Sequence, residues 1–75
     1  MQEWINAIMT NEITSFAKKL REVRLKKKLS QGDVAKILNV HRTYISGLER
    51  GRRNPSLATI QKLAKALNVS PKDFL

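Results

Sequence analysis

A chain of 75 residues can fold only one small domain, because a protein of this size buries only about 60% of the surface that its unfolded chain exposes. It carries 15 Lys and Arg against 6 Asp and Glu, a formal net charge of +9, and no cysteine. The lack of cysteine excludes disulfides and thiolate metal sites. The excess of positive charge favours a polyanionic partner, which binds through release of counterions from phosphates.

No apolar run approaches the ~18 residues that a membrane span needs, and the N-terminus lacks the basic-then-apolar order of a secretory signal. We therefore expect a cytoplasmic protein of a prokaryote, associated with the nucleoid and without a membrane partner. A single histidine and no recognisable carboxylate pair argue against an enzyme or a metal site. We expect no catalytic residue, no metal and no cofactor.

The apolar periodicity predicts an all-α fold of five helices without strands. The first helix is expected over residues 13–28, where apolar side chains recur every three or four residues. Lysines 26–28 suit the negative C-terminal end of its dipole. Its inward face comprises Ile13, Phe16, Ala17, Leu20 and Val23.

The second and third helices are predicted to cross at a sharp turn. Ser30 as N-cap, with Asp33 three residues later, predicts a helix over residues 31–38, and Asn39 suits a left-handed turn after it. The third helix is expected from residue 42 to about residue 50, and Gly51 should end it. The residues expected to point inward are Val34, Ala35, Leu38, Val40, Ile45 and Leu48.

Two capping serines predict the remaining helices. Ser56 and Asn68 bound a fourth helix with an apolar stripe. Ser70 caps a last short helical turn that begins at Pro71 and carries Phe74. The apolar stripe of the fourth helix consists of Leu57, Ile60, Leu63, Ala64 and Leu67.

Residues 1–12 form an N-terminal extension to this domain, which we place at residues 13–75. Trp4, Ile5, Ile8 and Met9 lie at helical spacing in the extension. This spacing fits either a frayed segment or an added helix that covers core or interface surface. Met9 is also a candidate internal start.

Residues 31–50, QGDVAKILNVHRTYISGLER, separate an apolar face from a polar edge within two short helices. Over roughly residues 13–75 the chain resembles the helix-turn-helix domains of phage repressors and Cro-like proteins, a five-helix, lambda-repressor-like DNA-binding family. The stretch HRTYISGLERGRRNPS further resembles the controller proteins of restriction-modification systems, which regulate their own gene and the endonuclease gene. The resemblance implies a sequence-specific transcriptional regulator that binds double-stranded DNA.

Side chains at the start of the third helix are the candidates for reading DNA bases. Arg42 can give guanine a bidentate fork, worth about 1 to 3 kcal/mol of discrimination, or alternatively clamp a phosphate. Thr43 can contact a thymine methyl or cap its helix. Ser46 shares the face of Arg42, and Gly47 beside it allows either close approach to DNA or tight packing against another helix. The predicted base-reading residues are Arg42, Thr43 and Ser46.

Contacts to the DNA backbone are expected on both sides of the third helix. Gln31 begins the second helix, where the resembling family uses this glutamine to grip a phosphate. Tyr44 can donate to a phosphate or lie partly buried, and the arginines that follow can bind phosphates or form a solvated charge run. The predicted backbone contacts are Gln31, Tyr44, Arg50, Arg52, Arg53 and Asn54.

Glu49 is the exception on this basic surface, because phosphates would repel it unless it turned inward and found a partner. In the resembling repressors, an arginine seven positions before the first motif residue pairs with a glutamate at the nineteenth. Those positions are Arg24 and Glu49 here. We therefore expect an ion pair that fastens the first helix to the third.

The resemblance also implies a homodimer. The family places its dimer contact at the C-terminal end, where Val69, Phe74 and Leu75 are the predicted interface; alternatively, all three complete the monomer core. Two-fold symmetry would hold two reading helices about 34 Å apart and demand a palindromic operator.

RNA polymerase is a further candidate partner, because activation needs a contact with it. Several activating relatives carry acidic residues at the second or sixth motif positions, whereas this chain has Gly32 and Lys36. Repression is therefore better supported than activation. The alternative functions are a prophage-type repressor, or an antitoxin that binds a toxin protein and its own promoter.

Overall fold

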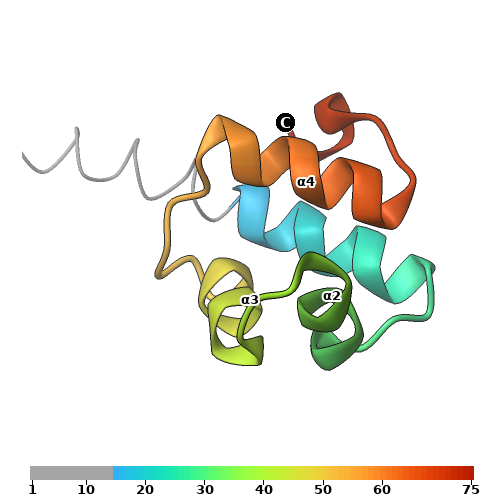
Figure 1. Ribbon diagram of the computed structural model, residues 1–75. Coiled ribbons are helices and arrows are strands. Elements are labelled where there is room, and N and C mark those ends of the chain that lie inside the picture. The colour runs from blue at the N-terminus through green and yellow to red at the C-terminus, as the bar shows by residue number, and fades with distance from the viewer. Residues whose placement is uncertain (1–14) are drawn as a thin grey trace, which may run out of the picture.

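The computed structural model describes residues 15–75 of the chain. In this range it contains four α-helices, one 3-10 turn and no strand (Figure 1). The N-terminal helix covers residues 15–26 of the described range. It is followed by α2 (Gln31–Leu38), α3 (Arg42–Glu49), α4 (Leu57–Leu67) and the 3-10 turn η1 (Pro71–Phe74). The all-α prediction is confirmed, while the predicted extension of residues 1–12 and Ile13 lie outside the described residues.

The fifth predicted element, a last short helical turn from Pro71, is a 3-10 turn, so the described residues hold four α-helices and not five. Its backbone bonds join residues three apart, from the Asp73 N–H to the Ser70 carbonyl at 2.9 Å and from the Leu75 N–H to the Lys72 carbonyl at 3.0 Å. A segment of four residues is too short to build a ladder of bonds between residues four apart.

Capping side chains set the bounds of α2 and α4. The Ser30 hydroxyl accepts from the Asp33 N–H at 2.9 Å, and the Asp33 carboxylate accepts from the Ser30 N–H at 2.8 Å. This reciprocal capping box lowers the pKa of Asp33, chiefly because the backbone N–H of Ser30 stabilises the charged carboxylate. Asn39 ends α2 in the left-handed conformation, and Ser56 and Asn68 bound α4 with a hydroxyl cap and a left-handed C-cap.

The N-terminal helix ends at residue 26, two residues before the predicted end. Lys28 is left-handed, with φ 60, and its N–H donates to the Leu25 carbonyl at 3.0 Å. The chain reverses here to enter α2, so the last two lysines belong to a turn and not to the helix.

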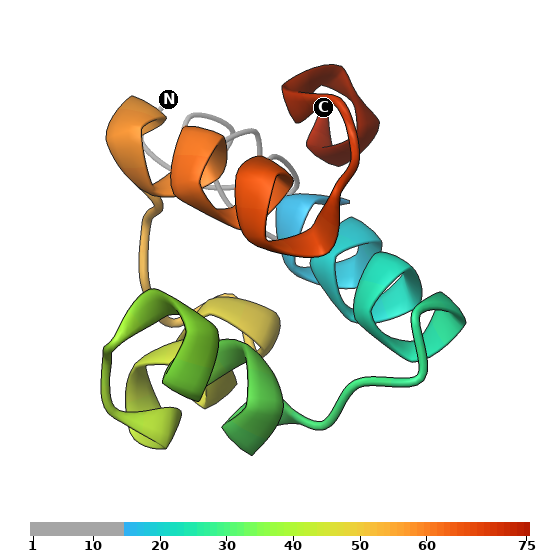
Figure 2. The same cartoon turned by 45° about the vertical axis from the view of Figure 1, so that its right-hand side comes forward.

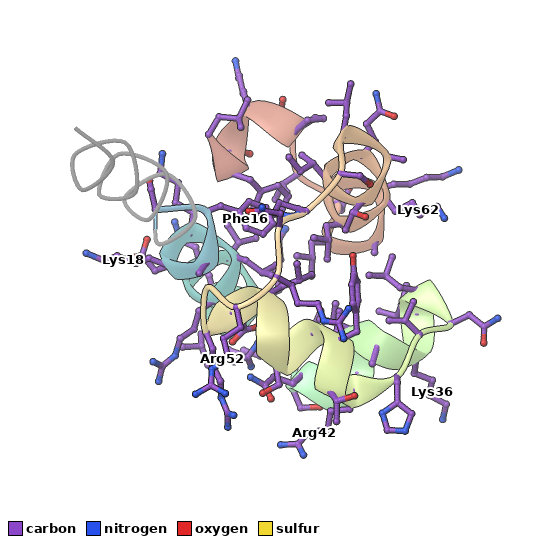
Figure 3. The ribbon with its side chains drawn as sticks, turned by 90° about the vertical axis from the view of Figure 1, so that its left-hand side faces the viewer. Phe16, Lys18, Lys36, Arg42, Arg52 and Lys62 are labelled. Carbon is purple, nitrogen blue, oxygen red and sulfur yellow. The ribbon has the colours of Figure 1, made fainter. Side chains whose placement is uncertain are left out.

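A single apolar core joins two parts of the molecule. In Figures 1 and 2, α2 and α3 lie together in the lower part, and α4, η1 and the N-terminal helix form the upper part. Phe16 lies between the helices (Figure 3), and its ring centroid is 5.9 Å from that of Phe74. The buried cluster consists of Phe16, Leu20, Val34, Ala35, Ile45, Leu48, Leu63, Ala64, Leu67 and Phe74.

Two residues that were expected to point inward do not. Val40 is 39% exposed and lies in the turn after α2. Its backbone N–H, and not its side chain, attaches it to α2 by donating to the Ala35 carbonyl at 2.9 Å. Leu57 is 71% exposed. It is the first residue of α4, next to the N-cap, and the buried residues of this helix lie in its later turns.

The side chain of Phe74 belongs to the monomer core, the second of the two roles that the sequence allowed for it. Its side chain is 1% exposed and packs on Phe16 within the same chain, so it completes the monomer core. Val69 is partly buried against that core, whereas Leu75 is 75% exposed. The turn is tied down by the Lys19 ammonium, which donates to the Leu75 carbonyl oxygen. Leu75 is therefore the one predicted interface residue whose side chain is largely exposed.

Candidate nucleic-acid interface

The predicted base-reading residues lie on the outer side of α3. Ile45 and Leu48 are both fully buried and fix one face of this eight-residue helix against the core. Arg42 consequently points away from the body of the molecule (Figure 3). His41 is the N-cap of the helix, and its Nδ1 accepts from the Thr43 N–H at 3.4 Å and lies 3.0 Å from the Thr43 hydroxyl. Thr43 thus takes part in the N-cap of α3 and is also exposed on the outer side of this helix.

A shallow hollow of about 380 Å³ brings the three predicted base-reading residues together with Gly47 and the arginines of the following loop. Arg42 lies at one end of α3 and Arg50, Arg52 and Arg53 follow its other end. Among the described residues, no acidic side chain lines the hollow. Four guanidinium groups around one concave surface suit phosphate oxygens and the acceptor edge of guanine.

Gly47 makes room for a basic side chain of the loop. A Cβ placed on Gly47 would lie 3.1 Å from Cγ of Arg53, which is too close for comfortable packing. Arg53 crosses there to bring its guanidinium carbon 5.8 Å from the centroid of the Tyr44 ring, within the range of a cation–π contact. The side chain that packs on Gly47 thus comes from the following loop and not from another helix, and close approach of Gly47 to DNA stays a prediction.

Tyr44 is partly buried, and its hydroxyl lies 3.2 Å from the Thr59 hydroxyl of α4. The Thr59 hydroxyl is also 2.9 Å from that of Ser56, the N-cap of α4. This chain of hydroxyls ties α3 to the start of α4. The sequence did not indicate Thr59, because the contact joins residues 15 apart that no local pattern relates. Asn54, the last predicted backbone contact, is exposed.

Arg24 and Glu49 form a bidentate pair. Arg24 Nε donates to Glu49 Oε2 at 2.6 Å and Nη2 donates to Oε1 at 2.9 Å. Arg24 Nη1 also donates to the Leu29 carbonyl at 2.8 Å. The side chains are 9% and 4% exposed. The hydrogen bonds that Arg24 donates to Glu49 raise the pKa of Arg24, against the opposing effect of burial, so the guanidinium remains charged.

Gln31 lies beside this pair. Its side-chain Nε2 donates to Glu49 Oε1 at 3.2 Å. The sequence analysis predicted a DNA-backbone contact for Gln31 and an ion pair for Glu49, but it did not predict the hydrogen bond between them. They meet because α2 and α3 cross at the turn, a geometry that the sequence pattern indicates without giving the distances.

The helix-turn-helix family model matches residues 20–74. This chain belongs to the helix-turn-helix family. Control protein C.BamHI from Bacillus amyloliquefaciens is 52% identical over 69 residues, which cover 89% of this chain and 85% of that protein. The crystal structure of the restriction-modification controller protein C.AhdI from Aeromonas hydrophila matches with a TM-score of 0.83 and 42% identity, over 87% of this chain and 98% of that one.

A second controller structure in this helix-turn-helix family, C.Esp1396I, was solved as a tetramer in complex with its natural 35 base-pair operator. It matches with a TM-score of 0.76 and 35% identity, over 84% of this chain and 83% of that one. The resemblance to restriction-modification controllers found in the sequence is confirmed by these relatives.

Within residues 15–75, no helix is long and apolar enough to cross a lipid bilayer. In the same range, the acidic and histidine side chains gather nowhere in a group of three that could hold a metal ion.

Proposed function

We propose that this protein is the controller of a restriction-modification system, a double-stranded-DNA-binding transcriptional regulator that controls its own promoter. One observation carries the proposal: in a helix-turn-helix protein, the three base-reading candidates and three further arginines line one concave surface on the outer edge of α3. Such regulators act by occupying DNA and need no catalytic group. The proposed location is the prokaryotic cytoplasm, on the nucleoid.

The dimensions of α3 suit the major groove. Eight helical residues span about 12 Å, and the groove is about 12 Å wide. Arg42 begins the helix and would reach base edges first, with Thr43 and Ser46 beside it. The arginines after α3, together with Asn54, Tyr44 and Gln31, would bind the phosphates on either side and supply affinity with little sequence information.

The proposed assembly is a homodimer on a palindromic operator. Leu75 supplies exposed apolar surface at the C-terminal end, and Val69 is partly buried against the core, whereas Phe74 would support this surface from beneath. Two-fold symmetry would space the reading helices by about one turn of DNA.

Repression is the proposed mode of action. Activation would require a favourable contact with RNA polymerase. The family resemblance implies acidic residues for that contact at the positions that Gly32 and Lys36 hold here. The one acidic side chain of α2, Asp33, is bound in the capping box of its own helix. It is therefore poorly placed to act as a substitute.

A binding titration tests the proposal. The full chain should bind the DNA upstream of its own gene more tightly than a scrambled duplex of equal length. Arg52→Ala should weaken both duplexes similarly and lower the slope of log affinity against log salt by about one unit. Equal affinity for the two duplexes would contradict sequence-specific regulation. A neighbouring endonuclease and methyltransferase gene pair would support the controller, whereas a toxin gene would favour the antitoxin alternative.

A further inference from the structure

The Glu49 carboxylate holds two side chains from different helices at once. Oε2 accepts from Arg24 Nε at 2.6 Å, and Oε1 accepts from both Arg24 Nη2 at 2.9 Å and Gln31 Nε2 at 3.2 Å. Its side chain is 4% exposed, while Gln31 is only partly buried. The amide of Gln31 therefore extends from a buried ion pair toward the surface.

The chemistry of this contact fixes which end of the Gln31 amide faces Glu49. An ionised carboxylate can only accept hydrogen bonds, whereas a glutamine amide has an NH₂ donor end and a carbonyl acceptor end. The bidentate fork from Arg24 favours the ionised carboxylate. Turning the amide over would place two oxygen atoms against each other, so the NH₂ end must face Glu49.

A DNA phosphate has the same requirement, because it too only accepts. The NH₂ group has two hydrogens, and Glu49 uses one of them. The second hydrogen stays available for a phosphate. Because Glu49 already holds the amide in one orientation, less side-chain entropy is lost when the phosphate binds. Glu49 is itself fixed, because Arg24 is tied through Nη1 to the Leu29 carbonyl at 2.8 Å.

We propose that Glu49 is a positioning residue for Gln31, which it holds ready to donate to a DNA phosphate. The ion pair then has a role in recognition besides its role in the fold. It sets the position of the α2 backbone contact relative to the base-reading residues of α3. This inference rests on the proposed function, since it concerns the same DNA interface.

A neutral-phosphate scan tests this role separately from folding. The probe is a duplex that the wild-type protein enriches from random double-stranded DNA, with a methylphosphonate placed at one linkage at a time. At the linkage that Gln31 contacts in each half-site, we expect wild type to lose about ten- to hundredfold in affinity, the size of a single charge-assisted hydrogen bond. In Gln31→Ala this linkage-specific loss should disappear.

Glu49→Gln keeps the shape of the side chain and removes its charge, so Gln31 is held less firmly and the loss at that linkage should be clearly smaller in this variant than in wild type. Glu22→Gln, at an exposed glutamate of the N-terminal helix, should behave like wild type. If Glu49→Gln does not fold, the double variant Arg24→Met with Glu49→Met leaves no buried charge unpaired and should fold and show the same result.

The outcomes separate the positioning role from the proposed function. A folded Glu49 variant that retains the full loss at the Gln31 linkage would overturn the positioning role alone. If wild type and Gln31→Ala lose affinity at the same linkages, Gln31 contacts no phosphate. That result would also overturn the positioning role and leave the proposed function standing. Failure to enrich any duplex would overturn the proposed function and this inference with it.

Discussion

The guanidinium of Arg24 forks onto the carboxylate of Glu49, 25 residues later in the chain, at 2.6 and 2.9 Å. With side chains 9% and 4% exposed, the pair joins the N-terminal helix to the end of α3 away from water. Removing one partner leaves the other charge buried and uncompensated, which is far more costly than losing a surface ion pair.

Glu49→Ala should therefore lower the free energy of unfolding by about 3 to 5 kcal/mol. For a domain of this size the melting temperature should fall by roughly 12 °C or more. Thermal unfolding followed by circular dichroism measures the change. Glu22→Ala, at an exposed site on the N-terminal helix, is the matched control and should melt close to wild type. A Glu49→Ala melting temperature equal to that of the control would show that the pair adds nothing to stability.

Phe74 and Leu75 are neighbours with opposite burial, so their variants should separate folding from self-association. Phe74→Ala should cost about 3 to 5 kcal/mol of stability, because it empties a site packed against Phe16. Leu75→Asp should leave the melting temperature almost unchanged but weaken the dimer, since its side chain is 75% exposed. Analytical ultracentrifugation at tens of micromolar measures the second effect, and a wild type that sediments as a monomer would refute the dimer.

Gly47→Ala should stabilise the fold yet weaken DNA binding. Alanine is favoured over glycine in a helix interior by about 0.8 to 1 kcal/mol, and the flexible side chain of Arg53 can move away from the new methyl. That movement would take Arg53 off the Tyr44 ring and disturb the hollow. Gly32→Ala is the control for helix propensity, because its new carbon would meet only Ser30 Oγ at an ordinary 3.7 Å. A Gly47→Ala protein that binds DNA as wild type does would show that Arg53 needs no defined position.

The lowered pKa of Asp33 predicts how acid affects α2. A carboxyl whose pKa is lower in the folded state adds stability above its unfolded pKa of about 3.9, and this stability is lost as pH falls through the folded value. Asp33→Asn should thus melt below wild type at pH 7, and the gap between them should close as the pH falls below about 4. Melting temperatures of both proteins from pH 7 to pH 2 provide the test. A gap that stays constant over this range would show that the charge of Asp33 adds nothing to the cap.

Local signals in the sequence predicted the helices well, because caps act on neighbouring residues. Ser30 and Asn39 bound α2 at the predicted positions, and the core residues of α3 follow from their spacing. The sequence left Phe74 between a dimer contact and the monomer core, because its burial depends on the packing of η1 against Phe16, which is distant in the chain. The contacts of Gln31 with Glu49 and of Tyr44 with Thr59 were missed for the same reason, since only the crossing of helices creates them.

The base-reading role of Arg42 is the central claim about function, and competitive binding to single-base variants of the enriched duplex tests it most directly. With wild type, substitution of one guanine in each half-site should reduce affinity by about 1 to 3 kcal/mol. Arg42→Ala should remove discrimination at that position and keep it elsewhere. If Arg42→Ala discriminates at every position as wild type does, Arg42 is a phosphate contact, and another residue of α3 reads the bases.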